Sequence, residues 1–173
     1  MNEALDGIFL IQGAQEPPGN SCQKPSRMRI LFEGGETMAD NGLVTTLSAN
    51  SVPQTVQQLI SSVTSKGMTV FATIDHGANA KEAGFAMKPT VLVIFGNPKA
   101  GTPLMIDKPT ISLDLPVKVL IWEDDDAKVW LTYTETAWLA RRHNLSESSQ
   151  PIIQAIAEGI RLVVSEASRP TQL

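Results

Sequence analysis

An acidic residue and a histidine, Asp75 and His76, stand side by side after an apolar stretch that ends at Ile74. A histidine at the end of a strand can titrate near neutral pH or bind a metal ion, and an acidic neighbour can orient its ring. Adjacent residues of a strand point to opposite faces, so Asp75 can orient His76 only if the strand ends there. A hydrogen bond from His76 to the backbone is the structural alternative.

A glycine-containing segment from Gly96 to Thr102 follows the apolar run that ends at Phe95. It has the glycine spacing of a phosphate loop, but Thr102 stands where that motif requires lysine, which argues against nucleotide hydrolysis. A helix that begins here could still bind an anion through its N–H groups, with Lys99 nearby. The alternative is a tight turn in which Asn97 caps the helix.

The second histidine, His143, is expected near a helix C-terminus, where an imidazolium is stabilised by the helix dipole. A metal site of two histidines and one carboxylate would require the fold to bring His143 and His76 together with Asp75 or Glu123. The sequence alone does not show that proximity. We therefore predict no metal site.

Other residue types add little catalytic chemistry. No G-x-S-x-G motif occurs and the single cysteine, Cys22, lies outside the predicted domain, so nucleophilic catalysis lacks an obvious agent. Asp114 and Lys118 flank the start of a predicted strand, where they could form an ion pair. Trp122 and Tyr133 can be cross-strand core residues, or they can line a pocket or a dimer surface.

Composition bounds the class of protein. The 173 residues are 42% hydrophobic and 18% charged, which fits one globular domain with a sizeable core. A net charge of −4 and a pI near 5.2 argue against nucleic acid and acidic membranes as partners. No apolar run is long enough for a membrane span, the first residues lack the basic opening of a secretory signal, and the lone cysteine fits a reducing cytoplasm.

We predict three regions. Residues 1–39 form a flexible or non-native extension, residues 40–167 form the domain, and residues 168–173 form a C-terminal tail. The extension is rich in Gln, Gly, Pro, Asn and Ser, which is typical of an unpacked segment. Codons for the Glu-Gly-Gly sequence at residues 33–35 can spell a ribosome-binding sequence, so Met38 is a candidate initiator. An ordinary flexible extension is the alternative.

Hydrophobic periodicity and turn residues predict the elements of the domain. Strands are expected at residues 43–47, 68–76, 89–95, 115–122 and 128–133, and helices from Ser51 to about Gly67, at 99–105, up to about His143 and from Pro151 onward. Residues 77–84 are expected to be a small-residue crossing with up to one helical turn, and residues 123–126 a solvated hairpin turn. Because the crossings are short, we predict an α+β fold in which a mainly antiparallel sheet carries helices on one face.

Four ordered motifs support a family resemblance. They are Ile74-Asp75-His76, PTVLVIFGNPKAGTPLM at 89–105, LDLPVKVLIWED at 113–124 and LARRH at 139–143. On these motifs residues 43–165 resemble the domain of unknown function 302 family. The resemblance implies a TATA-binding-protein-like β-α-β4-α topology and frequent homodimers, and it names no reaction. Asn79 and Lys81 depart from the family, whose members commonly carry small apolar residues there.

The leading functional hypothesis is a non-catalytic homodimeric module that binds a small ligand or an anion. Its candidate ligand-binding residues are Asp75, His76, Asn97, Lys99, Thr102, Trp122 and Tyr133. An enzyme or metal-binding protein that uses His76 is one alternative, and a structural domain for dimerisation or partner binding is another.

Overall fold

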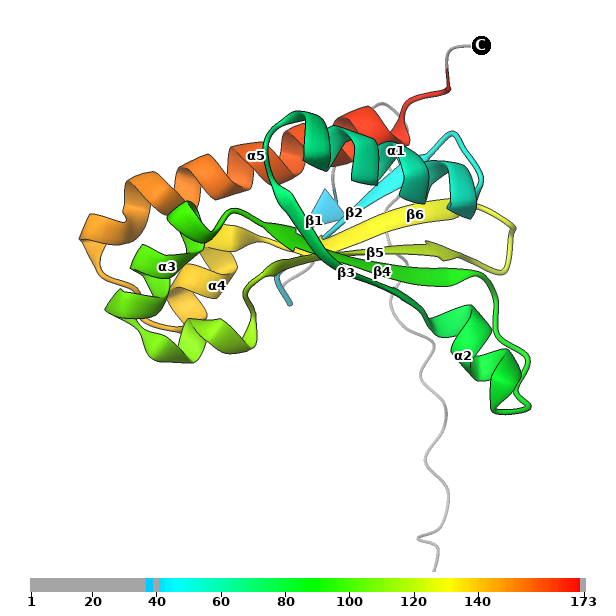
Figure 1. Cartoon of the computed structure of the whole chain (residues 1–173), viewed down its shortest axis with the longest axis horizontal. Helices are drawn as coiled ribbons and strands as arrows, with labels where there is room; N and C mark the ends of the chain where they lie inside the picture. Colours follow the sequence, from blue (N-terminus) through cyan, green and yellow to red (C-terminus); the bar gives the residue numbers. More distant parts are fainter. Residues whose placement is uncertain (1–36, 39–40, 172–173) are drawn as a thin grey trace, which may run out of the picture. The chain divides into compact units, whose positions relative to one another are not determined.

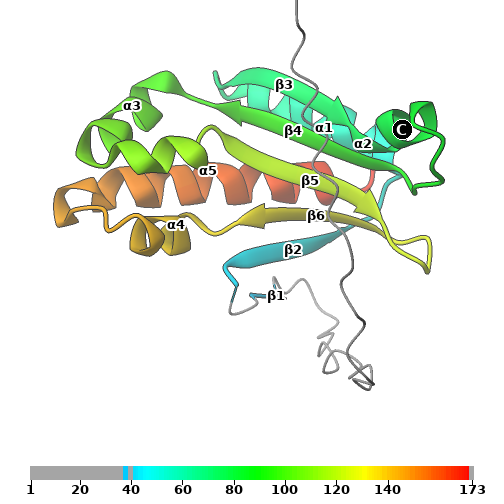
Figure 2. The same ribbon diagram turned by 90° about the horizontal axis from the view of Figure 1, so that it is seen from below.

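The computed structural model describes residues 37–38 and 41–171, which belong to one compact unit. Among these residues, six strands form one antiparallel sheet in the order β1-β2-β6-β5-β4-β3 (Figures 1 and 2). The strands are β1 (Thr37–Met38), β2 (Leu43–Ser48), β3 (Thr69–Asp75), β4 (Thr90–Gly96), β5 (Val117–Glu123) and β6 (Val129–Thr134). The predictions for residues 1–36, including Cys22, lie outside the described residues.

Two long helices lie across one face of the sheet, while shorter helices gather at its two ends (Figure 1). The helices are α1 (Val52–Ser65), α2 (His76–Glu82), α3 (Pro98–Asp107), α4 (Thr136–Arg142) and α5 (Gln150–Ser168), with 3-10 helices η1 (Pro109–Leu113) and η2 (Glu147–Ser149). Helices α1 and α5 cover the sheet, α3 and α4 lie at one end, and α2 lies at the other. The predicted α+β fold with an antiparallel sheet is confirmed.

Helix α1 follows directly from its sequence. Ser51 precedes the first turn, and its backbone N–H donates to Gln54 Oε1 at 3.2 Å, as a capping box requires. Pro53 lies in the first turn, where its missing N–H is not needed. Gly67 has a φ of +71° just beyond the last turn, a conformation that glycine adopts without strain.

The main core lies between this face of the sheet and the two long helices. Alternate residues of the central strands, Val93, Val119 and Leu131, are fully buried, and they meet Leu59 from α1 and Val163 from α5. Full burial of each such side chain contributes about 1.5–3 kcal/mol. This layer is therefore the principal source of stability in the fold.

A second, smaller core holds the α3 and α4 end together. Its buried members are Leu104, Ile111, Leu115, Ala140 and Ile153. Ile111 comes from η1, which the sequence did not predict because five residues with two polar members show no periodicity. The small core fixes α3, η1, α4 and the start of α5 as one assembly.

The segment after β3 is more helical than expected. The strand ends at Asp75, and α2 runs from His76 to Glu82 where at most one turn was predicted. Asp75 Oδ1 accepts the backbone N–H of Ala78 at 2.8 Å, so the carboxylate caps the helix. Satisfying one of the orphan N–H groups of the first turn helps to stabilise so short a helix.

A turn before β2 contains a glycine that cannot be replaced without strain. Gly42 has a φ of +76°, and a Cβ atom built there would lie 2.4 Å from Cγ of Trp138. Its carbonyl oxygen accepts the N–H of Glu135 at 2.8 Å, directly before α4. The close approach of this turn to Trp138 therefore requires a residue with no side chain.

We expect Gly42→Ala to lower the free energy of unfolding by about 2–4 kcal/mol, because left-handed backbone strain and overpacking against Trp138 add together. Gly84→Ala is the matched control, since Gly84 has a φ of +82° but a Cβ atom built there would meet nothing within 4 Å. It should cost only about 1 kcal/mol. Urea unfolding of both variants measures the difference, and equal losses would show that Trp138 does not restrict this turn.

Candidate functional site

The two candidate chemical centres lie at opposite ends of the sheet. In the antiparallel pair of β3 and β4, Asp75 is opposite Val91 and Thr69 is opposite Gly96. Asp75 and His76 therefore lie at the α2 end, while the segment after Gly96 lies at the α3 end (Figure 1). The structure does not bring these two groups of predicted residues together.

At the α2 end, the Asp75 side chain serves local structure. The Asp75 carboxylate accepts the N–H of Ala78, so it caps the helix that His76 begins. His143 follows α4 at the other end of the sheet, far from α2 (Figure 1). Within residues 41–171, no cluster of three or more His, Cys, Asp or Glu side chains is arranged to hold a metal ion.

At the α3 end, the helix N-terminus has already used its donors. Asn97 Oδ1 accepts the N–H of Lys99 at 2.9 Å, and the Asn97 carbonyl accepts from Ala100 at 2.9 Å and from Gly101 at 3.0 Å. Pro98 has no N–H to offer. Asn97 is thus the predicted helix cap, and an anion at this N-terminus would have to compete with these bonds.

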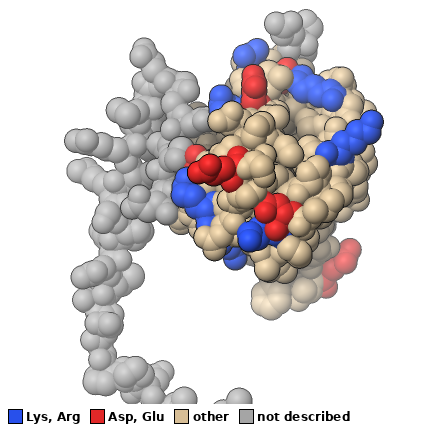
Figure 3. Space-filling model, turned by 90° about the vertical axis from the view of Figure 1, so that its left-hand side faces the viewer, with Lys and Arg blue, Asp and Glu red and all other residues tan. Residues whose placement is uncertain are grey.

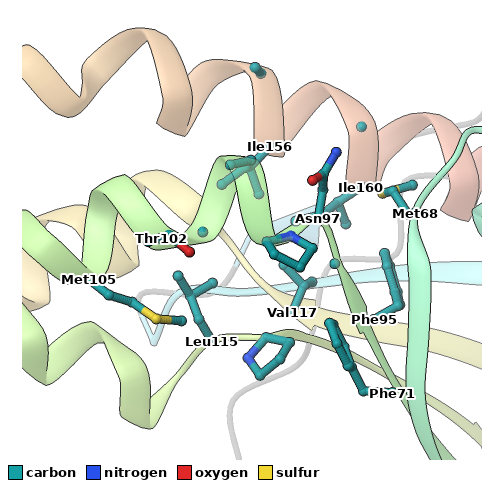
Figure 4. A pocket seen from close by; sticks show the side chains of 17 residues that line it. Met68, Phe71, Phe95, Asn97, Thr102, Met105, Leu115, Val117, Ile156 and Ile160 are labelled. Atoms are coloured by element: carbon teal, nitrogen blue, oxygen red, sulfur yellow. The ribbon is translucent and has the colours of Figure 1, made fainter.

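A cavity of about 330 Å³ opens beside the same helix (Figure 4). It lies where the end of β4, the start of β5, α3 and the middle of α5 converge. Its walls are mainly apolar: Met68, Phe71, Phe95, Met105, Leu115, Val117, Ile156 and Ile160, with Gly and Ala residues between them. This size is at the lower end of the range for small-molecule sites.

Two of the predicted residues, Asn97 and Thr102, line this cavity. The helix cap uses Asn97 Oδ1, which leaves the NH₂ group of the same amide as a donor. Lys99 is exposed on the first turn of α3 and is not part of the lining. The cavity therefore combines an apolar interior with two polar side chains from α3 and its cap.

A glycine makes room for the cavity. Gly159 lies within α5 and lines the cavity, and a Cβ atom built there meets nothing within 4 Å. Glycine inside a helix costs about 0.5–1 kcal/mol relative to alanine. The sequence signal for this position was available, because a glycine in the middle of a strongly periodic helix is unusual, but it could not reveal a cavity.

The predicted aromatic residues Trp122 and Tyr133 point to opposite faces of the sheet. Tyr133 is opposite Val119 and is buried in the main core. Trp122 is opposite Trp130 on the other face, and its Nε1–H donates to Thr132 Oγ1 at 3.0 Å. Neither residue lines the cavity.

The sheet face that carries Trp122 is not covered by any described helix (Figure 2). The strand register places apolar side chains of five strands on this open face: Leu43, Leu47, Ile74, Leu92, Ile94, Leu120, Trp122 and Trp130.

Polar side chains on the open face have hydrogen-bond partners within the chain. The hydroxyl oxygens of Thr45 and Thr132 lie 3.1 Å apart. The Lys118 ammonium donates to the carbonyls of Asp114 at 2.8 Å and Pro116 at 3.2 Å.

The bonds of Lys118 correct the predicted ion pair with Asp114. The lysine binds the Asp114 carbonyl, and the Asp114 carboxylate binds His143 Nε2 at 2.6 Å. His143 is 8% exposed, and its Nδ1 lies 3.1 Å from Thr110 Oγ1. The sequence did not predict that Thr110, Asp114 and His143 form one cluster. Thr110 lies 33 residues and Asp114 lies 29 residues before His143, too far apart for a local pattern.

The acidic turn between β5 and β6 is held by one carboxylate. Asp124 Oδ2 accepts Trp130 Nε1–H at 2.7 Å, and Oδ1 accepts the N–H groups of Asp126 and Lys128, each at 2.9 Å. The Trp130 hydrogen bond, assisted by these backbone donors, lowers the pKa of Asp124 below its ordinary value. The predicted hairpin turn thus has a specific physical cause.

Charge on the α3 and α4 end is mixed. Figure 3 shows acidic and basic side chains interspersed on this side of the molecule, with apolar and polar surface between them. Arg142 bridges the region, because its guanidinium lies 3.4 Å from Asp114 Oδ2 and 5.4 Å from the centre of the Trp138 ring. Among the described residues, no helix combines the length and apolar character that a membrane span needs.

Comparison with known proteins finds one matching family and relatives that are named as ion channels. The model of the family described as domain of unknown function DUF302 matches residues 44–163. The chain is 50% identical over 132 residues to "Fluoride-specific ion channel FluC 1" of Brucella suis biovar 1 (strain 1330), covering 76% of this chain and 52% of that protein. "Fluoride-specific ion channel FluC 2" of Brucella melitensis biotype 1 is also 50% identical over 132 residues, covering 76% and 49%. The chain spans about half the length of these curated relatives.

A solved structure shares the fold. The crystal structure of an uncharacterized conserved DUF302 protein from Bacillus stearothermophilus matches with a TM-score of 0.66 and 16% identity. The match covers 74% of this chain and 98% of that one. At this identity the similarity concerns the fold alone.

We expect Asp124→Asn to destabilise the protein at neutral pH and to leave it unchanged at strongly acidic pH. A lowered folded-state pKa stabilises the protein above the ordinary carboxyl value of 3.8, and this stabilisation is lost as the pH falls through the lowered pKa. Urea unfolding between pH 7 and pH 3, followed by tryptophan fluorescence, measures the effect. Asp125→Asn in the same turn is the control, and a difference from wild type that grew toward acidic pH would contradict the assignment.

Proposed function

Since this chain belongs to the DUF302 family, whose description names no reaction, we propose from its geometry that the domain binds a small molecule in the cavity beside α3. The single observation that carries the proposal is the apolar cavity of about 330 Å³ at the end of the sheet. Removing apolar surface of a ligand from water there is favourable by about 25 cal/mol per Å². In this proposal the cavity binds its ligand without catalysing a reaction on it, as a binding module does, and the domain works in the cytoplasm.

The lining favours a ligand with an apolar body and a polar or anionic head. Phe71, Phe95 and Ile160 supply apolar contacts, while the Asn97 amide and the Thr102 hydroxyl can donate hydrogen bonds to a head group. A small anion without an apolar body would gain little, because the N–H groups of the first turn of α3 are already bonded within the helix. This refines the predicted choice between a small ligand and an anion.

The relatives support a role as an attached module. Those proteins are named as fluoride-specific channels, and about half of their length matches this chain. In this chain the sheet is covered by helices whose outer faces carry polar side chains such as Gln54, Gln57 and Glu158. We propose that this half of the relatives is a binding module joined to the channel.

We also propose that the domain is a homodimer formed through the open face of the sheet. The face carries apolar side chains of five strands, and its hydroxyl, indole and ammonium groups already have partners in the same chain. These internal bonds lower the cost of covering the polar groups of this face. A second copy presents the same apolar surface, and two sheets can pack face to face about 10 Å apart.

The cavity is tested by filling it. We expect Gly159→Leu to weaken binding of the dye 1-anilinonaphthalene-8-sulfonate by about tenfold or more, because its side chain occupies the open space that Gly159 leaves. Gly159→Ala is the control: it should keep dye binding and stabilise α5 by about 0.5–1 kcal/mol. Fluorescence titration and urea unfolding measure the two effects. Unchanged dye affinity in Gly159→Leu would refute the cavity as the binding site.

Competition identifies the ligand class in the same assay. We expect octanoate, with an apolar chain and a carboxylate, to displace the dye from wild-type protein, and sodium fluoride to act no differently from sodium chloride. Displacement by fluoride alone would instead connect the cavity to the ion named for the relatives.

The dimer is tested with two leucines of similar exposure. Leu47 lies on the open face and is 45% exposed, and Leu162 lies on α5 and is 47% exposed. Light scattering should find wild type and Leu162→Glu as dimers and Leu47→Glu as a monomer, because only Leu47→Glu places a charge in the interface. Circular dichroism checks the fold. A monomeric wild type, or dissociation caused only by Leu162→Glu, would overturn the proposed surface.

A further inference from the structure

Three side chains at the α3 and α4 end form a hydroxyl, imidazole and carboxylate in series. Thr110 Oγ1 lies 3.1 Å from His143 Nδ1, and His143 Nε2 lies 2.6 Å from Asp114 Oδ2. Thr110 lies in η1, Asp114 directly follows η1, and His143 directly follows α4. This site is separate from the N-caps of α2 and α3 and from the apolar lining of the cavity.

The carboxylate determines which imidazole nitrogen is basic. Ionised Asp114 can only accept hydrogen bonds, so the neutral ring of His143 carries its proton on Nε2 and leaves the lone pair on Nδ1. The Thr110 hydroxyl then donates to Nδ1. This is the polarity that activates a hydroxyl nucleophile, with the two ring nitrogens in fixed roles.

Burial and neighbouring contacts hold the ring in this orientation. His143 is 8% exposed, and both of its ring nitrogens have partners. Arg142 lies 3.4 Å from the same Asp114 oxygen and stacks over Trp138, which restricts the carboxylate from a second side. Thr110 itself is exposed on η1, so its hydroxyl lies where a reactant from solution can approach.

We propose that Thr110, His143 and Asp114 form a nucleophilic centre that accepts an acyl group from an activated ester or thioester. Thr110 Oγ1 forms a bond to the carbonyl carbon while its proton passes to His143 Nδ1. The bond from that carbon to the leaving oxygen or sulfur breaks, and the leaving group departs with the proton. Water attacks the acyl-threonine in the second half, and its proton passes through Nδ1 to Thr110, which releases the carboxylic acid.

This inference goes beyond ligand binding and depends on different atoms. The chain enters η1 from α3 and leaves it toward β5, and the flanking residues Met105 and Leu115 both line the apolar cavity. An acyl chain held in that cavity would therefore belong to the same end of the molecule. The reaction at Thr110 is nevertheless tested with an acyl donor that needs no cavity.

The test uses the full chain and p-nitrophenyl acetate. We expect p-nitrophenolate release with one acetyl group on Thr110, located by mass spectrometry of the peptides. Thr110→Val, which keeps the shape of the side chain and removes the hydroxyl, should abolish this adduct, whereas Thr110→Ser should retain it. Ser112→Ala is the matched control, because Ser112 is an exposed hydroxyl residue on the same 3-10 helix and should leave the adduct unchanged.

The positioning role of Asp114 has its own readout. Asp114→Asn should slow acetylation by about a hundredfold or more, because it no longer fixes the basic nitrogen of the ring, and nitrogen NMR should show that His143 loses its Nε2–H preference. Absence of an acetyl group on Thr110 in the folded wild type would overturn the proposal and leave the trio as a purely structural link. An equal adduct in Thr110→Val would do the same. Neither result affects dye binding in the cavity.

Discussion

Burial of one face of the sheet beneath α1 and α5 is the constraint on which the other features depend. Leu59 and Val63 from α1 and Val163 from α5 are fully buried against the central strands. The two helices are also joined at their surface, because Lys66 Nζ lies 2.8 Å from Glu166 and Ser62 donates to the same carboxylate. Two helices placed on one face leave the other face open and confine the remaining segments to the ends of the sheet.

Those ends differ in what they can accommodate. At the α2 end, β3 and β4 are connected by the short helix α2, which has no buried residue and therefore adds no core of its own. At the α3 end, the small core around Ile111 and Leu115 packs several short elements against the start of α5, and the cavity lies beside this core. Both the proposed ligand site and the acyl-accepting trio therefore belong to the end with the extra layer.

The sequence predicted the features that depend on local pattern. The α1 helix with its cap at Ser51, the uninterrupted β4 run and the acidic turn at Asp124 were all readable, because periodicity and turn chemistry act over a few residues. It could not predict which distant side chains meet. The contact of Thr110 with His143 depends on η1, which has no periodic signal, and Trp122 and Tyr133 were grouped together although strand alternation places them on opposite faces. The predicted ion pair between Asp114 and Lys118 was wrong, because the Lys118 ammonium donates to the backbone carbonyls of Asp114 and Pro116 instead of the carboxylate.

Asn50, between β2 and α1, forms hydrogen bonds to the residues that follow α5. Its side-chain amide donates to the carbonyl of Arg169 at 2.6 Å and accepts from the N–H of Thr171 at 3.1 Å, while the N–H of Ala49 donates to Ser168 at 2.9 Å. Residues almost at the two limits of the domain thus form one junction. Because α5 also supplies half of the cover over the sheet, the core cannot close on the ribosome until about residue 168 has emerged. Until then the core-facing sides of β4, β5 and β6 lack the cover of α5, so this topology exposes apolar surface for most of the synthesis of the domain.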